Sequence, residues 1–101
     1  MAIEITHALL EAISNPFALQ ILIYLLQKGE AKLSDILVFI TGFSRYKSVR
    51  KTLLKLEAVG LINRKIISWG RAQKWVITLT EMGEKLAKSI SAVLKLFIKE
   101  K

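Results

Sequence analysis

The hydrophobic period of the chain changes twice along its length, and this change restricts the possible folds more than any other feature. Up to about residue 60, apolar residues recur at helical spacing. Residues 61–69 and 73–79 are instead rich in β-branched and aromatic residues, which predicts two strands joined by the short glycine-containing loop 70–72. Helical spacing returns after Thr80. The pattern predicts an α+β fold, mostly α, with one two-stranded β-hairpin.

Two helices are predicted in the first third of the chain. Residues 3–14 carry apolar residues at helical spacing, and Asn15-Pro16 ends this helix. Asparagine is a good N-cap and proline suits the first helical position, so the same pair is expected to begin the second helix, residues 16–28. That helix is apolar nearly all round, which predicts a central position in the core.

The next two helices form a helix-turn-helix candidate. Residues 30–33 are expected to be extended, and a brief third helix is predicted over residues 35–40. A glycine-containing turn follows, and Ser44 is the expected N-cap of a fourth helix over residues 44–58, closed by Gly60. Two helices joined by a short turn of this kind are typical of the helix-turn-helix motif.

The whole chain is predicted to be one domain. A last helix begins after Thr80, its expected N-cap, and runs to the C-terminus. At 101 residues the chain supports a single core, and neither an internal repeat nor a linker divides it. We therefore expect one domain over residues 1–101, with its core in residues 15–80 and flanking helices in residues 3–14 and 81–101.

The positive charge of the chain is concentrated in residues 44–74. This segment has one acidic residue, Glu57, and nine basic residues, so its excess of eight positive charges equals the net charge of +8 of the whole chain. The basic residues are Arg45, Lys47, Arg50, Lys51, Lys55, Arg64, Lys65, Arg71 and Lys74. A neutral scaffold with one basic segment indicates a surface that binds a polyanion.

The fourth helix separates its apolar and basic residues onto different faces. At about 100° per residue, one stripe consists of Val49, Leu53 and Leu56. The opposite and flanking positions hold Lys47, Arg50 and Lys51, and the first turn holds Arg45 and Tyr46. A basic face alone could serve solubility only. The second basic cluster on the adjoining hairpin favours binding instead.

The order of these motifs resembles the winged helix-turn-helix regulators of the ArsR and MarR type. The resemblance covers about residues 15–84 and includes the patterns Val49-x-x-x-Leu53-x-x-Leu56-Glu57-x-x-Gly60-Leu61-Ile62 and Leu79-Thr80-x-x-Gly83. It implies that helix 44–58 enters the major groove of DNA and that the hairpin 61–79 acts as a wing on the backbone or minor groove. The chain is also similar in size and charge to small archaeal winged-helix regulators and chromatin-associated proteins.

The resemblance and the charge pattern together define a set of candidate DNA-binding residues. Arginine can contact guanine in a bidentate manner, whereas lysine neutralises phosphate. The candidates are Ser44, Arg45, Tyr46, Lys47, Arg50, Lys51, Lys55, Arg64, Lys65, Arg71 and Lys74.

Metal-dependent and catalytic functions are not expected. The chain has no cysteine and one histidine, His7, which is expected at the surface, so no metal site and no cofactor are predicted. No carboxylate pair, nucleophile–base set or phosphate-binding loop is visible, which argues against an enzyme. Trp75 alternates with Ile77 and Leu79 and is expected in the core, whereas Trp69 beside the hairpin tip could contact DNA, a partner or the hairpin itself.

The flanking helices are expected to form a homodimer. The apolar arc of the last helix approaches 200°, wider than the roughly 100° that packing against one core requires. A hydrophobic content of 52% is also high for so small a chain. The predicted interface residues are Ile5, Leu9, Leu86, Ile90, Val93, Leu94, Phe97 and Ile98. The alternative is a basic helix lying on an anionic membrane, which Glu81, Glu84 and Glu100 weaken.

The function expected from the sequence is that of a dimeric transcriptional regulator that binds double-stranded DNA. The alternatives are an architectural chromatin protein with little sequence preference and a module that binds an acidic protein. The N-terminus lacks the features of a signal peptide, and the longest apolar run, residues 17–26, is too short for a membrane span. A cytoplasmic, nucleoid-associated protein is expected. The abundance of Ile and Lys indicates a thermophilic source, and the resemblance to small archaeal winged-helix proteins implies an archaeal one.

Overall fold

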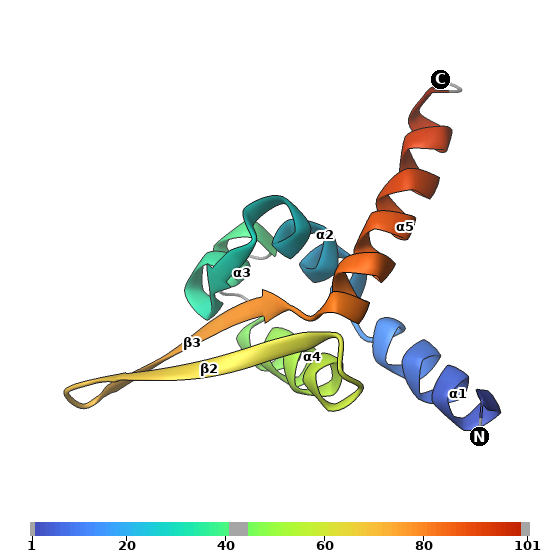
Figure 1. Cartoon of the computed structure of the whole chain (residues 1–101). Coiled ribbons are helices and arrows are strands. Elements are labelled where there is room, and N and C mark those ends of the chain that lie inside the picture. The colour runs from blue at the N-terminus through green and yellow to red at the C-terminus, as the bar shows by residue number, and fades with distance from the viewer. Residues whose placement is uncertain (1, 41–44, 100–101) are drawn as a thin grey trace.

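The computed structural model describes the backbone of residues 2–40 and 45–99, and the side chains of residues 7–40, 45–68 and 70–98. Figure 1 shows the helices and strands in this part of the chain. They are α1 (Ala2–Ile13), α2 (Ala18–Lys28), β1 (Glu30–Lys32), α3 (Leu33–Ile40), α4 (Tyr46–Ala58), β2 (Ile62–Trp69), β3 (Ala72–Leu79) and α5 (Glu81–Lys99). The predicted α+β, mostly helical fold with a β-hairpin is confirmed.

The three strands form one antiparallel sheet in the order β1-β3-β2. The hairpin register runs from the pair Ile62 and Leu79 to the pair Trp69 and Ala72 at the tip. β1 extends the base of the hairpin, where Ala31 lies opposite Ile77. The hairpin projects from one side of the molecule, and α1 and α5 project from the other (Figure 1).

The core lies between α2, α3, α4 and the inner face of the sheet. α2 contributes four buried residues to it, Ala18, Ile21, Leu22 and Leu25, which confirms its central position. The largest fully buried side chains are Ile21, Leu22, Leu25, Ile36, Leu37, Leu53, Leu56, Leu61, Ile62, Ile77, Val49 and Thr52. α2 also carries Leu19, which is 43% exposed, so one side of this apolar helix is left uncovered.

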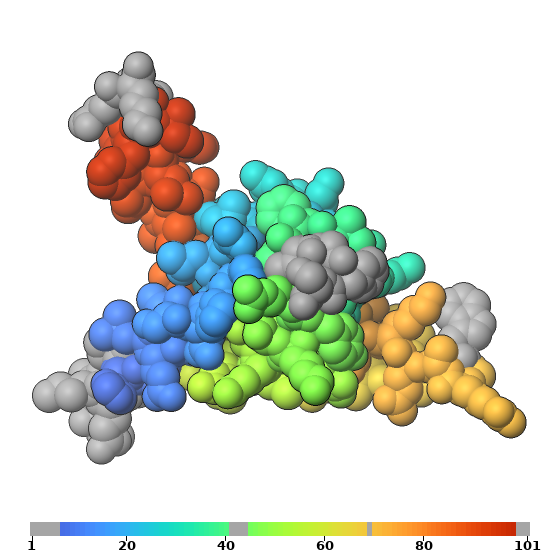
Figure 2. Space-filling model, turned by 180° about the vertical axis from the view of Figure 1, so that it is seen from behind, coloured from blue at the N-terminus to red at the C-terminus, as the bar shows by residue number. Residues whose placement is uncertain are grey.

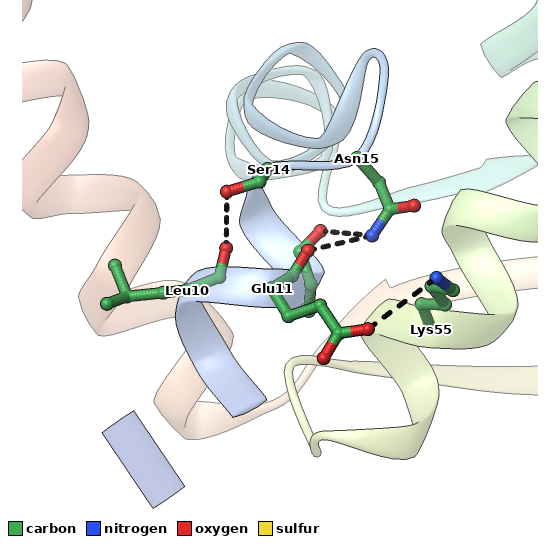
Figure 3. Close-up of polar contacts among 6 residues, drawn as sticks. Leu10, Glu11, Ser14, Asn15 and Lys55 are labelled. Atoms are coloured by element: carbon green, nitrogen blue, oxygen red, sulfur yellow. Dashed lines mark hydrogen bonds and ion pairs between the residues drawn. The ribbon is translucent and has the colours of Figure 1, made fainter. Parts of the chain in front are cut away.

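The connection between α1 and α2 differs from the prediction. Asn15 does not cap α2: its Nδ2 atom donates hydrogen bonds to the carbonyl oxygens of Glu11 at 2.9 Å and Ala12 at 3.1 Å, and thereby closes α1 (Figure 3). The carbonyl oxygen of Pro16 accepts a hydrogen bond of 2.9 Å from Thr52 Oγ1 of α4. The next residue, Phe17, has a left-handed backbone with a φ of 67°, so α2 begins two residues later than predicted, at Ala18.

Hydrogen bonds link the turn after α4 to the first turn of α5. The N–H of Gly60, whose φ is 82°, donates to the carbonyl of Glu57, and the N–H of Leu61 donates to the carbonyl of Leu56. Thr80 Oγ1 donates to the Gly60 carbonyl at 2.6 Å and accepts from the Gly83 N–H at 3.0 Å. The predictions that Gly60 closes α4 and that Thr80 caps α5 are therefore confirmed.

The start of the helix-turn-helix is described in part. α3 begins at Leu33, earlier than predicted, and Asp35 Oδ2 accepts a hydrogen bond of 3.3 Å from the Lys32 N–H. α4 begins at Tyr46 after Arg45. The predicted cap Ser44 and the turn before it lie outside the described residues.

Candidate nucleic-acid interface

α4 has one buried face and one basic face. The side chains of Val49, Leu53 and Leu56 are fully buried, and Lys47, Arg50 and Lys51 are exposed. The periodicity therefore predicted the orientation of α4 correctly. Figure 2 shows α4 (green) at the molecular surface between α1 and the orange part of the hairpin, so its outer face adjoins the hairpin.

The hairpin distributes its basic residues over two faces and the tip. Its turn is the two-residue Gly70-Arg71 loop, shorter than predicted, in which Gly70 has a φ of 62°, as a type II′ turn requires. Arg71 is exposed at this tip. Successive residues alternate between faces, so Lys65 and Lys74 lie on the outer face and Arg64 lies on the inner face with Trp75. The structure thus brings Arg64 toward α4 and places Lys65 on the opposite face of the hairpin.

Trp75 connects the hairpin to α4. The ring is 8% exposed, and the guanidinium carbons of Arg50 and Arg64 lie 4.7 and 4.5 Å from its centroid. Arg64 Nε donates a hydrogen bond of 3.0 Å to Glu57 Oε1 on α4. We refer to Arg50, Glu57, Arg64 and Trp75 as the Trp75 cluster. Its contacts link α4 to β2 and β3, because cation–π and charged hydrogen bonds hold side chains from all three elements together.

The expected core position of Trp75 is confirmed, but its contacts with arginine were not predicted. Arg64 lies on the same face of β2 as Ile62 and Ile66, two residues away on either side. This position among apolar residues could have identified it as a packing residue. Arg50 also donates a hydrogen bond of 3.3 Å from Nη1 to the hydroxyl of Tyr46. Three candidate DNA-binding residues, Tyr46, Arg50 and Arg64, therefore contact one another or Trp75.

Lys55 also has a partner within the chain. Its Nζ lies 3.9 Å from Glu11 Oε1, so the candidate DNA-binding lysine at the end of α4 contacts α1 (Figure 3). The pair is partly exposed and contributes about 0–1 kcal/mol to stability. Its position nevertheless indicates that Lys55 serves the packing of α1 against α4 in addition to any contact with DNA.

A cleft of about 390 Å³ opens beside the N-terminal end of α4. Its lining residues are Lys32, Leu33, Ser34, Leu37, Tyr46, Arg50, Gln73, Lys74 and Trp75. Lys32 was not among the candidates, because only the pairing of β1 with β3 brings it next to Arg50 and Lys74. The cleft therefore adds one lysine to the basic surface.

The predicted dimer residues fall into two groups. Leu9, Leu86 and Ile90 are half-buried and pack against the core of their own chain. Val93, Leu94, Phe97 and Ile98 are 48–71% exposed and lie on the part of α5 that extends away from the body (Figure 1). The side chains of Ile5 and Trp69 lie outside the described set, so the expectations for them stay predictions.

The described part of the chain offers no candidate metal site and no single helix that could span a membrane. Within residues 2–40 and 45–99, no group of three or more His, Cys, Asp or Glu side chains is placed to hold a metal ion, and His7 is exposed. In the same residues, no single helix is long and apolar enough to cross a membrane. Taken together, the segments His7–Ile13 and Ala18–Lys28 are long and apolar enough by length and composition, but they are bent by 83° relative to each other.

The fold and the basic surface of α4 and the hairpin define the chain as a winged helix-turn-helix protein of the transcriptional-regulator class, and not as an enzyme. The sequence matches the HxlR-like helix-turn-helix model over residues 13–100, so the chain belongs to this family. No curated protein sequence matches it. The resemblance to MarR-type winged helix-turn-helix regulators is confirmed at the level of fold and class.

Three solved structures illustrate the similarity. A transcriptional regulator homologue from Pyrococcus horikoshii OT3 is 26% identical, with 89% of this chain and 87% of that chain covered and a TM-score of 0.71. A protein from Enterococcus faecalis V583 described as a MarR-family regulator is 20% identical, with coverages of 99% and 90% and a TM-score of 0.74. PadR from Bacillus subtilis, solved in complex with operator DNA, is 21% identical, with coverages of 85% and 60% and a TM-score of 0.61.

Proposed function

We propose that this protein is a dimeric transcriptional regulator that binds double-stranded DNA, with α4 in the major groove and the β2–β3 hairpin on the backbone or minor groove. The observation that supports this proposal most strongly is that α4 has one buried face and one exposed basic face. Its apolar stripe is fully buried and its basic side is exposed beside the hairpin. An α-helix with its side chains is about 10–12 Å across, so α4 fits the roughly 12 Å width of the major groove.

The candidate contacts divide by chemistry. Lys47 and Lys51 are exposed on the outer face of α4 and suit phosphate contacts. Arg50 is exposed but rests against Trp75, so its guanidinium is already oriented and suits a bidentate contact with guanine. Arg71 at the tip of the hairpin suits the minor groove or the backbone. Arg64, with its side chain 23% exposed and paired to Glu57, is the weakest candidate.

The size of the molecular surface supports a dimer. A compact monomer of 11.4 kDa exposes about 5,800 Å², whereas this chain exposes 7178 Å², an excess of about 1,400 Å². The radius of gyration, 14.2 Å, also exceeds the roughly 12.7 Å of a compact domain of this length. One partner of a stable interface buries about 800 Å² or more, so the excess is large enough to form one.

The salt dependence of DNA binding tests the proposal. If each subunit of a dimer makes about four phosphate contacts, log K falls against log salt with a slope of about −7. Lys47→Ala with Lys51→Ala is expected to make this slope shallower by about 3–4, because four contacts per dimer are lost. Lys85→Ala with Lys88→Ala, on α5, removes the same charge and is the matched control. Equal binding by both double variants, or a slope near zero for the wild type, would refute the assignment.

An architectural chromatin protein is the second candidate. The predominance of lysine over arginine on the outer face of α4 favours it, because lysine contacts phosphate without reading bases. Affinity for a promoter and for the same DNA scrambled, at matched salt, separates the two roles. A ratio near one supports the architectural role and excludes the regulator. Either role corresponds to a cytoplasmic, nucleoid-associated protein, and an archaeal, thermophilic source stays a prediction.

A further inference from the structure

The cleft beside the N-terminal end of α4 combines positive charge with apolar walls. Its volume of about 390 Å³ lies within the roughly 300–1,000 Å³ range of small-molecule sites. None of its described lining residues is acidic. The cations are Lys32, Arg50 and Lys74, and the apolar and aromatic lining residues are Leu33, Leu37, Tyr46 and Trp75. We propose that this cleft binds a small aromatic phosphate ester, the chemical class of a mononucleotide, and that the bound ligand competes with DNA.

The cations of the cleft come from three different elements. Lys32 ends β1 and lies opposite Val76 of β3, Lys74 precedes Val76 on β3, and Arg50 belongs to α4. Asp35 of the adjoining α3 does not line the cleft, and its Oδ2 accepts a hydrogen bond of 3.3 Å from the Lys32 N–H. Clefts lined by one sign of charge focus the electric field and concentrate ions of the opposite sign. The fold therefore builds a site for an anion here.

Arg50 is already oriented before any ligand binds. Its Nη1 donates a hydrogen bond of 3.3 Å to the Tyr46 hydroxyl, and its guanidinium carbon lies 4.7 Å from the Trp75 ring centroid and 6.0 Å from the Tyr46 ring centroid. A guanidinium restrained in this way loses little conformational entropy on binding, and its planar donors match two oxygens of a phosphate. The cleft is thus preformed around its arginine.

The walls of the cleft favour an aromatic group on the phosphate. Leu37 and Trp75 are 2% and 8% exposed and form a fixed apolar wall, whereas Tyr46 is 42% exposed and offers ring surface for stacking. A phosphate monoester has a charge of about −1.5 to −2 at pH 7, so it offsets the three cations better than a carboxylate does. Inorganic phosphate would leave the apolar walls uncovered. A small aromatic phosphate ester matches both halves of the lining.

Occupation of the cleft and binding of DNA exclude each other. Tyr46, Arg50 and Lys74 line the cleft and are also candidate DNA-binding residues, so they cannot hold the ligand and DNA at the same time. The ligand also neutralises positive charge on which DNA binding depends. The inference rests on the proposed function and adds regulation to it: the aromatic phosphate ester releases DNA, and DNA weakens ligand binding by the same factor.

Tryptophan fluorescence measures ligand binding, with adenosine monophosphate (AMP) as the probe. The chain has two tryptophans, so Trp69→Phe leaves Trp75, which lines the cleft, as the single reporter. The fluorescence change is expected to saturate with AMP. The dissociation constant of AMP is expected to be at least about tenfold below those of adenosine, which lacks the charged hydrogen bonds, and of inorganic phosphate, which lacks stacking. Equal binding of either compound would overturn the assigned ligand class.

Substitutions inside and outside the cleft test the location of the site. In the Trp69→Phe background, Lys32→Met is expected to raise the dissociation constant of AMP at least about tenfold. Lys65→Met removes the same charge on the outer face of the hairpin, outside the cleft, and is the matched control, with an expected change below about twofold. Equal weakening by both would show that AMP responds to overall charge only and would overturn the site.

A second cleft variant keeps this test valid if Lys32→Met does not fold, which circular dichroism reveals. Gln73→Glu adds a negative charge to the lining at an exposed position and is also expected to weaken AMP binding at least about tenfold. Unchanged AMP affinity in this variant would likewise overturn the site.

Displacement of DNA tests the regulatory part of the proposal. The affinity for a fluorescein-labelled duplex is measured by anisotropy, with NaCl in the reference sample to match the ionic strength of AMP. AMP at about ten times its dissociation constant is expected to weaken binding of the duplex about tenfold in the wild type. At the same AMP concentration, Lys32→Met is expected to show a change of about twofold or less. Unchanged affinity of the wild type would overturn the competition.

The two proposals fail in different ways. If the protein binds the duplex but AMP does not bind in the cleft, the ligand site is wrong and the proposed function stands. If AMP binds through Lys32 but the protein binds no duplex at low salt, the proposed function is wrong. In that case the cleft stands as a ligand site, and its proposed effect on DNA is overturned.

Discussion

Replacing Trp75 with leucine tests whether the Trp75 cluster holds α4 and the hairpin together. The ring is 8% exposed, and complete removal of such a side chain typically costs about 3–5 kcal/mol. Leucine retains part of the volume, so the packing loss is expected to be about 2–3 kcal/mol. The two cation–π contacts, with Arg50 and Arg64, add about 0.5–1 kcal/mol each. The total of roughly 3–5 kcal/mol is a large part of the 5–15 kcal/mol that stabilises a domain.

A double-mutant cycle separates the cation–π contacts from packing. The free energy of unfolding is measured by urea denaturation, with circular dichroism as the signal, for Trp75→Leu, Arg64→Met and the combination. A coupling of about 0.5–1 kcal/mol is expected for Arg64, and the same for Arg50→Met. Lys65→Met on the outer face is the control, with an expected coupling below about 0.3 kcal/mol. Equal coupling for Lys65 and both arginines would refute the role assigned to the cluster.

The same substitution has a distinct effect on DNA binding if α4 is the recognition helix. Trp75→Leu removes no charge, so the salt slope is expected to stay within about one unit of the wild-type value. The orientation of Arg50 and the angle between α4 and the hairpin are less restrained without the ring. The ratio of affinities for promoter and scrambled DNA is therefore expected to fall by about tenfold, and a change in slope with an unchanged ratio would contradict this account.

Three further substitutions test how the helices are joined. Gly83→Ala is expected to destabilise the fold by about 3 kcal/mol or more, because the added methyl group overlaps the Leu61 carbonyl group, and backbone atoms cannot move aside cheaply. Gly29→Ala, where φ is 81° but no atom lies nearby, is the control and is expected to cost about 1 kcal/mol in the same urea titration. Thr52→Val is expected to cost about 1–3 kcal/mol, because the Pro16 carbonyl loses its 2.9 Å hydrogen bond from a buried hydroxyl; an unchanged midpoint would show that water replaces it.

The features that could be predicted from the sequence are those set by local periodicity and capping. The stripe of Val49, Leu53 and Leu56 repeats at the period of a helix, so one buried face followed directly from the spacing. The hairpin followed from β-branched residues on both sides of a glycine, and the cap at Thr80 from a hydroxyl followed by acidic residues. Each of these signals lies within a few residues of the structure that it determines.

The features that could not be predicted depend on contacts between distant segments. Residues 30–33 were expected to be extended, but the pairing of β1 with β3, which places Ala31 opposite Ile77, was not predicted, because three residues carry too little pattern to indicate it. Asn15 was expected both to end α1 and to cap α2, but its side chain closes α1 only, because its amide group donates to carbonyl groups of that helix. The engagement of Arg64 with Trp75 and Glu57 was missed, because a count of basic residues does not show which are already paired.

The contacts around α4 also explain how a dimer formed through α5 would fix the position of the DNA-binding surface. The Trp75 cluster attaches the hairpin to α4, and Thr80 attaches the first turn of α5 to the carbonyl of Gly60, directly after α4. Gly83 allows that turn to lie against Leu61 without steric overlap. The direction of α5 is therefore set at the end of α4. In the proposed dimer, the position at which the distal part of α5 binds the second copy determines the distance between the two α4 helices, which must be about 34 Å to reach successive major grooves.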